Sequence, residues 1–185
     1  KVAGAKISFD PNIRPQLIPP DRARYAFAPF INAADVVLPT NNEILMLYDS
    51  FLIDAGIHHW LENDLEKRVI VKQDVEGCTC YRSSDEFVSE GLPFMVEVLP
   101  VGAYEVQEVD PTGAGDCFDA GFLVRWLAGD SVDDAAQFAN ACGALAVTVQ
   151  GPMAGAKTLE AVQAFMRENT PKDPDEYDPD EPIQE

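Results

Sequence analysis

A glycine-rich turn that leads directly into an amphipathic helix constrains this chain more than any other feature. The turn is the run 109–116, which reads VDPTGAGD, and apolar residues follow it at helical spacing, namely Phe118, Phe122, Leu123 and Trp126. Gly113 and Gly115 permit backbone angles that other residues resist and leave room for a ligand. Because a helix start presents unpaired N–H groups and the positive end of the helix dipole, the run predicts an anion site, usually one for phosphate.

An acid lies inside this predicted anion site. Asp116 falls in the first turn of the helix, where a carboxylate held among N–H groups stays ionised and can accept a proton. A phosphate cradle that contains a base is what phosphoryl transfer to a hydroxyl requires. The alternative is structural, since Asp is favoured in the first turn of any helix and Asp116 would then only complete the helix start.

Composition and charge exclude several classes of protein. The 185 residues are 46% hydrophobic, which suits one domain with a core, and the formal net charge of -19 disfavours nucleic acid and anionic membrane surfaces as partners. No apolar stretch is long enough to span a membrane. The four cysteines, Cys78, Cys80, Cys117 and Cys142, predict reduced, buried thiols of a cytoplasmic protein rather than a disulfide or zinc site.

Strand-like and helix-like segments alternate along the chain, which predicts an α/β fold with a largely parallel sheet. Strands are expected at 5–9, 35–38, 68–72, 78–81 and 94–98, with the fourth as an antiparallel partner of the third. Helices are expected to open at 19–21, 41–43 and 51, and then near 114, 132 and 159. Residues 170–185 are rich in proline and acidic residues, which predicts a disordered or loosely attached tail after a domain spanning 1–169.

Two motifs resemble those of one enzyme family. The segment 110–116 resembles the D-T-x-G-A-G-D motif of the ribokinase-like (PfkB) carbohydrate kinases, with Pro111 in place of the first Thr. The segment 10–14, which reads DPNIR, resembles the D-x-N-x-R segment of fructokinases and 2-keto-3-deoxygluconate kinases. The resemblance covers about residues 2–166 and implies a ribokinase-like three-layer sandwich. In the family this region is the C-terminal part of a longer protein, so we expect a partial domain whose N-terminal part and lid, through which members often form homodimers, are absent.

The resemblance implies a kinase that transfers the γ-phosphoryl group of ATP, with Mg²⁺, to a sugar hydroxyl. Asp116 would be the base, and the backbone N–H groups of Gly113, Ala114, Gly115 and Asp116 would form the anion hole. The sugar is expected to be a ketose or a keto-acid sugar, of the 2-keto-3-deoxygluconate, fructose or tagatose type. The alternative is a non-catalytic fragment or pseudokinase that binds nucleotide or a partner without turnover.

Two residues of the DPNIR segment are implied on the substrate side, Asn12 and Arg14. The segment is predicted at the carboxyl end of a strand, where ligands bind in open α/β sheets. Arg14 can face a substrate carboxylate, for which a bidentate guanidinium is well suited. Contact with a phosphate and a structural pair with an acid are the alternatives.

The nucleotide is implied to contact Lys72, Gly77 and Asn140. Many relatives carry a pair of glycines in the turn after Lys72, and here Asp74 replaces the first one. A negative charge near the phosphates of ATP is unfavourable unless it points away or meets magnesium. For Asn140 the alternative is a buried amide that is satisfied by the backbone.

Metal-binding positions are implied at two further places. Glu43 matches the acid of the family's N-x-x-E segment, which helps to hold magnesium-bound water, although Thr40 stands where that segment has Asn and is equally explained as a helix N-cap. In relatives that use a monovalent cation, K⁺ lies beside the positions that match Asp110, Thr112, Ala146, Val149 and Gly151. Gly155 stands where those relatives often carry Ser and lacks the hydroxyl. The alternative for Asp110 is that it caps its own turn.

Overall fold

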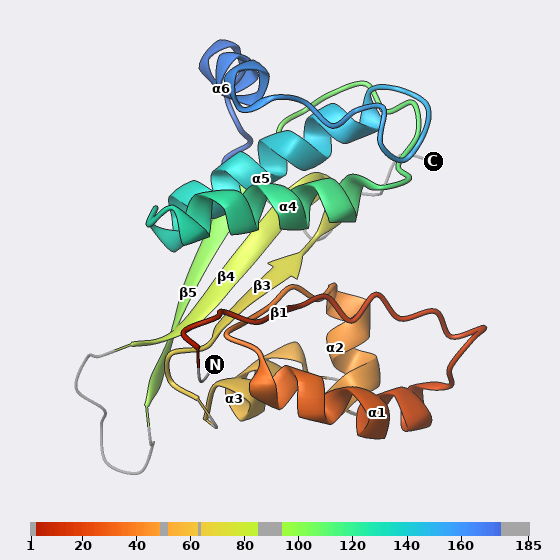
Figure 1. Ribbon diagram of the computed structural model, residues 1–185, viewed down its shortest axis with the longest axis vertical. Coiled ribbons are helices and arrows are strands. Elements are labelled where there is room, and N and C mark those ends of the chain that lie inside the picture. The colour runs from red at the N-terminus through yellow and green to blue at the C-terminus, as the bar shows by residue number, and fades with distance from the viewer. Residues whose placement is uncertain (1–2, 49–51, 63, 85–93, 175–185) are drawn as a thin grey trace. The chain divides into compact units, whose positions relative to one another are not determined.

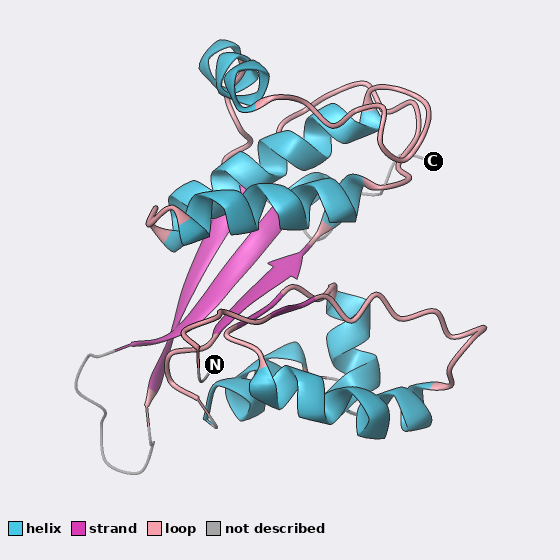
Figure 2. Ribbon diagram, viewed as in Figure 1, coloured by secondary structure: helices cyan, strands magenta, loops and turns pink. Residues whose placement is uncertain are grey.

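The computed structural model describes the chain except for residues 1–2, 49–51, 63, 85–93 and 175–185 (Figure 1). The strands are β1 (Ser8–Phe9), β2 (Val36–Val37), β3 (Arg68–Lys72), β4 (Gly77–Ser84) and β5 (Met95–Gly102). The helices are α1 (Pro20–Ala33), α2 (Asn41–Tyr48), α3 (Ile53–Glu62), α4 (Ala114–Leu127), α5 (Val132–Val147) and α6 (Leu159–Glu168), and a 3₁₀ turn, η1, covers Asp74–Glu76 (Figure 2). The predicted α/β class is confirmed.

The strands form one five-stranded sheet in the order β1-β2-β3-β4-β5. β1 pairs with β2 and β2 pairs with β3 in parallel, with Ser8 and Arg68 each opposite Val36. Only residues 73–76 join β3 to its neighbour β4, and a parallel pair needs a crossover of a dozen or more residues, so this pair runs antiparallel as predicted.

The predicted elements all have counterparts, and the differences lie at their ends. β1 is shorter than the predicted strand at 5–9, while β4 and β5 are longer than predicted. β4 extends into polar sequence because strand pairing is a property of the backbone, and Arg82 and Glu97 form an ion pair between the two long strands. The helix predicted from 51 begins at Ile53, and residue 51 lies outside the described residues.

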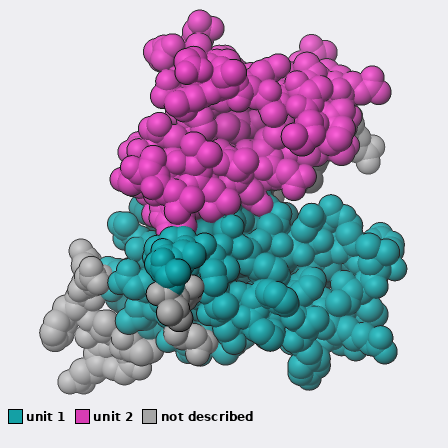
Figure 3. Space-filling model, in the orientation of Figure 1, with its two compact units in different colours: residues 1–73, 79–99 teal, residues 74–78, 100–185 magenta. Residues whose placement is uncertain are grey.

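The chain divides into two compact units, which are described separately (Figure 3). Unit 1 comprises residues 1–73 and 79–99, and unit 2 comprises residues 74–78 and 100–185. The division falls within β4 and β5, so both strands contribute residues to both units.

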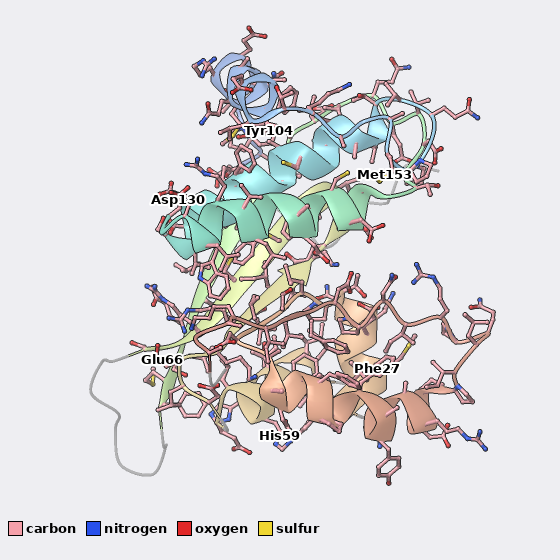
Figure 4. All side chains as sticks on the ribbon, viewed as in Figure 1. Phe27, His59, Glu66, Tyr104, Asp130 and Met153 are labelled. Atoms are coloured by element: carbon pink, nitrogen blue, oxygen red, sulfur yellow. The ribbon has the colours of Figure 1, made fainter. Side chains whose placement is uncertain are left out.

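The core of unit 1 forms around β2 and β3. Val37, Val69 and Val71 are fully buried, as the apolar runs around them predict for central parallel strands. The ring of Phe9 contacts Phe27 (labelled in Figure 4) edge-on at 5.7 Å between ring centroids. Residues of α1, α2 and α3 pack into the same apolar cluster.

The core of unit 2 depends on close packing between α4 and α5. The α5 sequence is rich in alanine, and Gly121 of α4 faces it so closely that an added Cβ would lie 2.7 Å from Cys142 Sγ. Small residues let helix backbones approach, as the sequence around Asn140 predicts. A second cluster joins α5 to α6, in which Tyr104 (labelled in Figure 4) meets Phe165 with 5.1 Å between ring centroids.

The four cysteines are free thiols, as predicted. Cys78 and Cys80 are almost fully buried in β4, and Cys117 and Cys142 are half-buried. Burial raises the pKa of Cys142 to about 12 and also raises the pKa of Cys117. These two groups are therefore thiols near neutral pH.

The first residues of the predicted tail are anchored in unit 2. The Lys172 N–H donates to the Ala103 carbonyl at 2.8 Å, and Lys172 Nζ donates to the Val75 carbonyl at 3.1 Å. Gly102 is in such close contact with the Lys172 backbone that no side chain fits there. A backbone and a side-chain hydrogen bond therefore hold Lys172, although prolines flank it. Residues 175–185 lie outside the described residues.

A buried lysine closes the end of α1. Lys67 is completely buried, and its ammonium group donates to the carbonyls of Ile31 at 2.7 Å and Ala34 at 2.5 Å. The last carbonyls of a helix have no intrahelical donor, and a positive charge is favoured there. Lys67 thus satisfies the C-terminal end of α1, a role that its polar neighbours in sequence do not indicate.

Replacement of Lys67 by Met should lower the free energy of unfolding by about 2–4 kcal/mol, because it leaves buried carbonyls without a donor. The control is Lys6→Met, which removes an exposed ion pair with Asp35 and should cost at most about 1 kcal/mol. Urea unfolding followed by circular dichroism measures both. Equal, small losses for the two variants would contradict the capping role of Lys67.

Candidate functional site

The glycine-rich turn of unit 2 begins α4 as predicted. Gly113 is the N-cap residue with φ 85° and ψ 1°, in the left-handed region that glycine adopts without strain. A Cβ at this position would also clash with the Pro152 carbonyl oxygen. Gly113 is therefore required by its own backbone angles, as predicted, and also by the neighbouring loop at Pro152, which the sequence did not indicate.

The start of α4 presents N–H groups beside an exposed acid. The helix opens with a hydrogen bond from Cys117 N–H to the Gly113 carbonyl, and the Ala114 N–H donates to the Pro111 carbonyl at 3.2 Å. Helix geometry leaves the N–H groups of the remaining first-turn residues without an intrahelical acceptor. Asp116 is exposed in this first turn. One of the four predicted anion-hole donors, Ala114, is thus already engaged within the turn.

The carboxylate of Asp110 joins this turn to the loop after α5. Its Oδ1 accepts the N–H of Thr112 at 3.0 Å, and its Oδ2 accepts the N–H of Gly151 at 2.8 Å. Hydrogen bonds from the Thr112 hydroxyl, the Thr112 N–H and the Gly151 N–H lower the pKa of Asp110 below its usual value. Turn capping, the alternative weighed for Asp110, is thus present in the structure.

The other residues predicted around a monovalent cation lie at the end of α5 and in the loop that follows it. The N–H groups of Val109 and Asp110 both donate to the Val147 carbonyl, at 2.8 and 3.1 Å. Ala146 is buried against Gly155, and Val149 lies in the turn that follows α5. The structure therefore brings Asp110, Thr112 and Gly151 into contact through hydrogen bonds.

Asn140 fastens α5 to β5. Its side chain is buried, and Nδ2 donates to the carbonyls of Val101 at 3.0 Å and Gly102 at 3.1 Å. Gln137, one turn earlier on α5, also donates to the Gly102 carbonyl at 3.1 Å. The backbone-satisfied amide, which was the alternative to a nucleotide contact, is what the structure contains.

The turn between β3 and β4 keeps a glycine-like backbone at both predicted glycine positions. Gly77 has φ 103°, and a Cβ there would clash with the Val101 carbonyl oxygen. Asp74 has φ 52°, and Asp is one of the few residue types other than glycine that adopt this region. The side chain of Asp74 is exposed. The substitution therefore preserves the backbone form of the turn.

In unit 1, three polar residues meet where parallel strands end. Asp10 follows β1, Thr40 follows β2, and Lys72 ends β3 with a bridge to Thr40. Lys72 Nζ lies 3.0 Å from Asp10 Oδ2, and the two side chains are 11% and 22% exposed. Such shielding from solvent strengthens the ion pair relative to one at the surface. Lys72, predicted as a nucleotide contact, is thus held by Asp10.

Glu43 connects the start of α2 to the DPNIR segment. Its Oε2 accepts the N–H of Thr40 at 2.8 Å and the Thr40 hydroxyl at 3.1 Å, while the Glu43 N–H donates to that hydroxyl at 3.4 Å. This reciprocal pattern is a capping box, with Thr40 as the N-cap. Glu43 Oε1 accepts the N–H of Ile13 at 2.6 Å. The buried carboxylate therefore fixes the segment that carries Asn12 and Arg14.

The two predicted substrate residues are exposed beyond this anchor. Asn12 has φ 43°, and its N–H donates to Asp10 Oδ1 at 3.0 Å. Arg14 Nη1 donates to the Ile13 carbonyl at 3.2 Å, so its guanidinium retains free donors in the part of the chain that the structure describes. Both side chains are accessible to a ligand.

The contacts that sequence reasoning missed all join positions far apart in the chain. They are the Ile13–Glu43 hydrogen bond, the Asp110–Gly151 hydrogen bond and the contact of Gly113 with Pro152. Each of these contacts uses a backbone group as one partner, namely the N–H of Ile13, the N–H of Gly151 and the carbonyl of Pro152. Every residue has such groups, so residue type does not reveal which of them is the partner.

Comparison with known proteins identifies the family of this chain. Residues 1–159 match the sequence profile of a family described as "pfkB family carbohydrate kinase". The chain belongs to this family. A probable fructokinase-7 from Arabidopsis thaliana is 34% identical over 178 residues, and an ATP-dependent ribose-1-phosphate kinase from Halopiger xanaduensis is 31% identical over 167 residues. Each match covers 90% of this chain and 48% of the relative.

Solved structures of this family share the fold. A putative ribokinase II from E. coli, in complex with ATP and Mg²⁺, aligns with a TM-score of 0.76 and 35% identity over 90% of this chain and 50% of its own. A double mutant of the fructokinase from Vibrio cholerae O395, in its fructose-, ADP- and potassium-bound form, aligns with a TM-score of 0.71 and 27% identity, over 88% and 50%. The predicted ribokinase-like fold is confirmed, and the chain spans about half the length of the relatives it matches.

Replacement of Gly113 by Ala should lower the free energy of unfolding by about 2–4 kcal/mol, from backbone strain together with the Pro152 clash. Gly129→Ala is a matched control, because Gly129 also has positive φ but an added Cβ there meets no atom within 4 Å. The control should lose about 1 kcal/mol. Denaturant unfolding compares the two, and equal losses would contradict the role given to the Pro152 contact.

The Asp110 hydrogen bonds should make part of the stability pH-dependent. Because the folded pKa is lowered, Asp110 stabilises the fold above its unfolded pKa of about 4, and this contribution is lost as pH falls through the folded value. The unfolding midpoint of the chain should exceed that of Asp110→Asn at neutral pH, and the gap should narrow below about pH 4. Thermal unfolding across pH measures the gap; a gap that stays constant on acidification would contradict this origin.

Proposed function

We propose that this chain carries the phosphoryl-transfer part of an ATP-dependent sugar kinase. The observation that carries the proposal is the start of α4, where an exposed Asp116 lies in the first turn, beside the N–H groups of a helix start capped by Gly113. Membership of the family of carbohydrate kinases supports it. The proposal extends to the longer polypeptide expected from the relatives' length, which we place in the cytoplasm and expect to form a homodimer.

In this proposal Asp116 accepts the proton of the sugar hydroxyl as that oxygen attacks the γ-phosphorus of ATP. The N–H groups of Gly113, Gly115 and Asp116 stabilise the charge on the transferred phosphoryl group. The Ala114 N–H, which already donates to Pro111, contributes less. The hydrogen bonds of Asp110 and the Pro152 contact of Gly113 hold these donors in place before any ligand binds, so little reorganisation opposes the reaction.

ATP and Mg²⁺ are the proposed cofactors, as in the E. coli complex. The described residues contain no cluster of three or more His, Cys, Asp or Glu side chains that could hold a metal by itself. This fits Mg²⁺, which usually keeps several waters and binds through substrate phosphates. Glu43 is the proposed acceptor for a metal-bound water, and Lys72, Gly77 and Asn140 are the proposed nucleotide-side residues. Asn140 would act by fixing β5 rather than through its engaged amide N–H₂.

The proposed acceptor is a ketose, with fructose ahead of a keto-acid sugar such as 2-keto-3-deoxygluconate. The similarity to fructokinases favours fructose. The exposed guanidinium of Arg14 favours a carboxylate, since it can bind one in a bidentate way. Turnover of wild type and Arg14→Lys with a panel of neutral and acidic sugars distinguishes these two. Arg14→Lys should weaken the binding of an acidic sugar far more than that of a neutral one, because lysine cannot bind a carboxylate in a bidentate way.

A non-catalytic role is the second candidate, and Asp74 favours it, because a negative charge near the phosphates of ATP is unfavourable. In that case the chain binds nucleotide or a partner protein without turnover. Nucleotide binding without phosphorylation of any sugar in the panel, by the longest natural polypeptide that contains this sequence, would support this candidate.

No helix among the described residues is long and apolar enough to cross a membrane.

Asp116→Asn should lower kcat by about 10²–10⁴-fold, because the amide keeps the shape of the side chain but cannot accept the proton. Asp133→Asn is the matched control, an exposed first-turn acid of α5 that should leave kcat within about twofold. Coupled-enzyme assays on the longest natural polypeptide measure both. Equal phosphorylation by wild type and Asp116→Asn would overturn the assignment of the base.

A further inference from the structure

The family implies a monovalent cation beside the turn that precedes α4, and the residues of this chain either fit such a site or do not. The fructokinase from Vibrio cholerae was solved in a potassium-bound form. A potassium site needs several oxygen atoms that converge on one empty volume and have lone pairs free to coordinate the ion. The residues that match such a site here are those of the 109–112 turn, the end of α5 and the 149–155 loop.

The first ligand that a cation would need, Asp110, already accepts a hydrogen bond on each of its carboxylate oxygens. Oδ1 accepts from Thr112 and Oδ2 accepts from Gly151, at 3.0 and 2.8 Å. The N–H of Gly151 therefore points at the carboxylate from the loop that would have to supply carbonyl oxygens to the ion. Its partial positive charge occupies one side of Asp110, as a bound cation would.

The second obstacle is the packing of Gly155 against the end of α5. Gly155 is buried, and a Cβ built on it would clash with the Cα, the carbonyl carbon and the carbonyl oxygen of Ala146. The hydroxyl that relatives often provide at this position has no room in this backbone arrangement. The Ala146 carbonyl oxygen, one of the implied cation ligands, lies close to Gly155.

We propose that in this chain the turn is organised by the hydrogen bonds of Asp110 to Thr112 and Gly151, in place of a monovalent cation. Asp110 is then a positioning residue that acts on the anion-hole N–H groups through the backbone of the turn. Its two N–H partners stabilise the negative charge of the carboxylate, and Gly155 lets the 151–155 loop approach α5 closely enough to supply one of them. The catalytic consequence, cation-independent turnover, rests on the proposed kinase function.

The first test does not need catalysis. Thermal unfolding of the 185-residue chain is measured in KCl, NaCl and tetramethylammonium chloride at one ionic strength. The midpoints should agree within about 1 °C, whereas a cation present at about 100 times its Kd would raise the midpoint by roughly 5–10 °C. A potassium-specific rise of that size would overturn the proposal.

Two variants sharpen this test. Asp110→Asn should lower the midpoint by the same amount in all three salts, because the lost acceptor serves N–H donors. Gly155→Ser should also lower it in all three salts, because the added side chain meets Ala146. Two results would show that the carbonyls here do coordinate a cation and would overturn the proposal. They are an unfolding midpoint of Gly155→Ser that recovers only in KCl, and a lower midpoint of Asp110→Asn that is confined to KCl.

A kinetic arm separates positioning from stability and applies where turnover is found. Wild-type kcat should be equal in potassium and tetramethylammonium salts, and Asp110→Asn should lower kcat to the same extent in both with KM for ATP unchanged. A purely structural Asp110 would leave kcat unchanged well below the unfolding midpoint. If no sugar is phosphorylated, the proposed function fails while the thermal test of the cation still stands.

Discussion

The turn before α4 depends on one carboxylate and one missing side chain. Asp110 accepts hydrogen bonds from the N–H of Thr112 in its own turn and from the N–H of Gly151 in the loop after α5. Because Gly113 has no side chain, that loop can lie against the start of α4. Together they fix the direction of the N–H groups around Asp116 without help from a ligand. An anion site stabilises charge best when its donors are already in place, since none of the interaction energy is then used to order them. The hydrogen bonds and close packing of this turn are thus the physical basis of the proposed chemistry.

Charged side chains also hold the loops at the strand ends of unit 1 in place. Glu43 is buried, yet each of its oxygens accepts hydrogen bonds, so its burial carries no unsatisfied charge. One oxygen caps α2 and the other holds Ile13, which leaves the neighbouring Asn12 and Arg14 exposed on a fixed backbone. Lys72, which ends β3, and Asp10, which follows β1, form a shielded ion pair. In both units, polar side chains that resemble ligand contacts in sequence also hold the loops that would present a ligand.

Much of the architecture could be predicted because its signals are local. The starts of α4, α5 and α6 follow from glycine, Ser131 and Thr158 in cap positions, and the buried strands follow from valine-rich runs. The length of β4 could not, because its polar second half is held by pairing with β5. Lys67 offered no signal either, since a lysine among acidic and basic neighbours is ordinarily exposed. Asn140 was recognised as important, but the choice between ligand and backbone depended on where the carbonyls of β5 lie.

The sequence by itself determined the family, the order of helices and strands and the position of the glycine turn with its acid. These follow from residue type and short spacing, which act within a few positions of the chain. Only the tertiary structure decided which partner each polar group has: Gly151 for Asp110, Ile13 for Glu43 and the last carbonyls of α1 for Lys67. The reason is that these partners are backbone groups distant in the chain, and every residue has such groups. Their pairing is therefore set by packing, which no single residue type encodes.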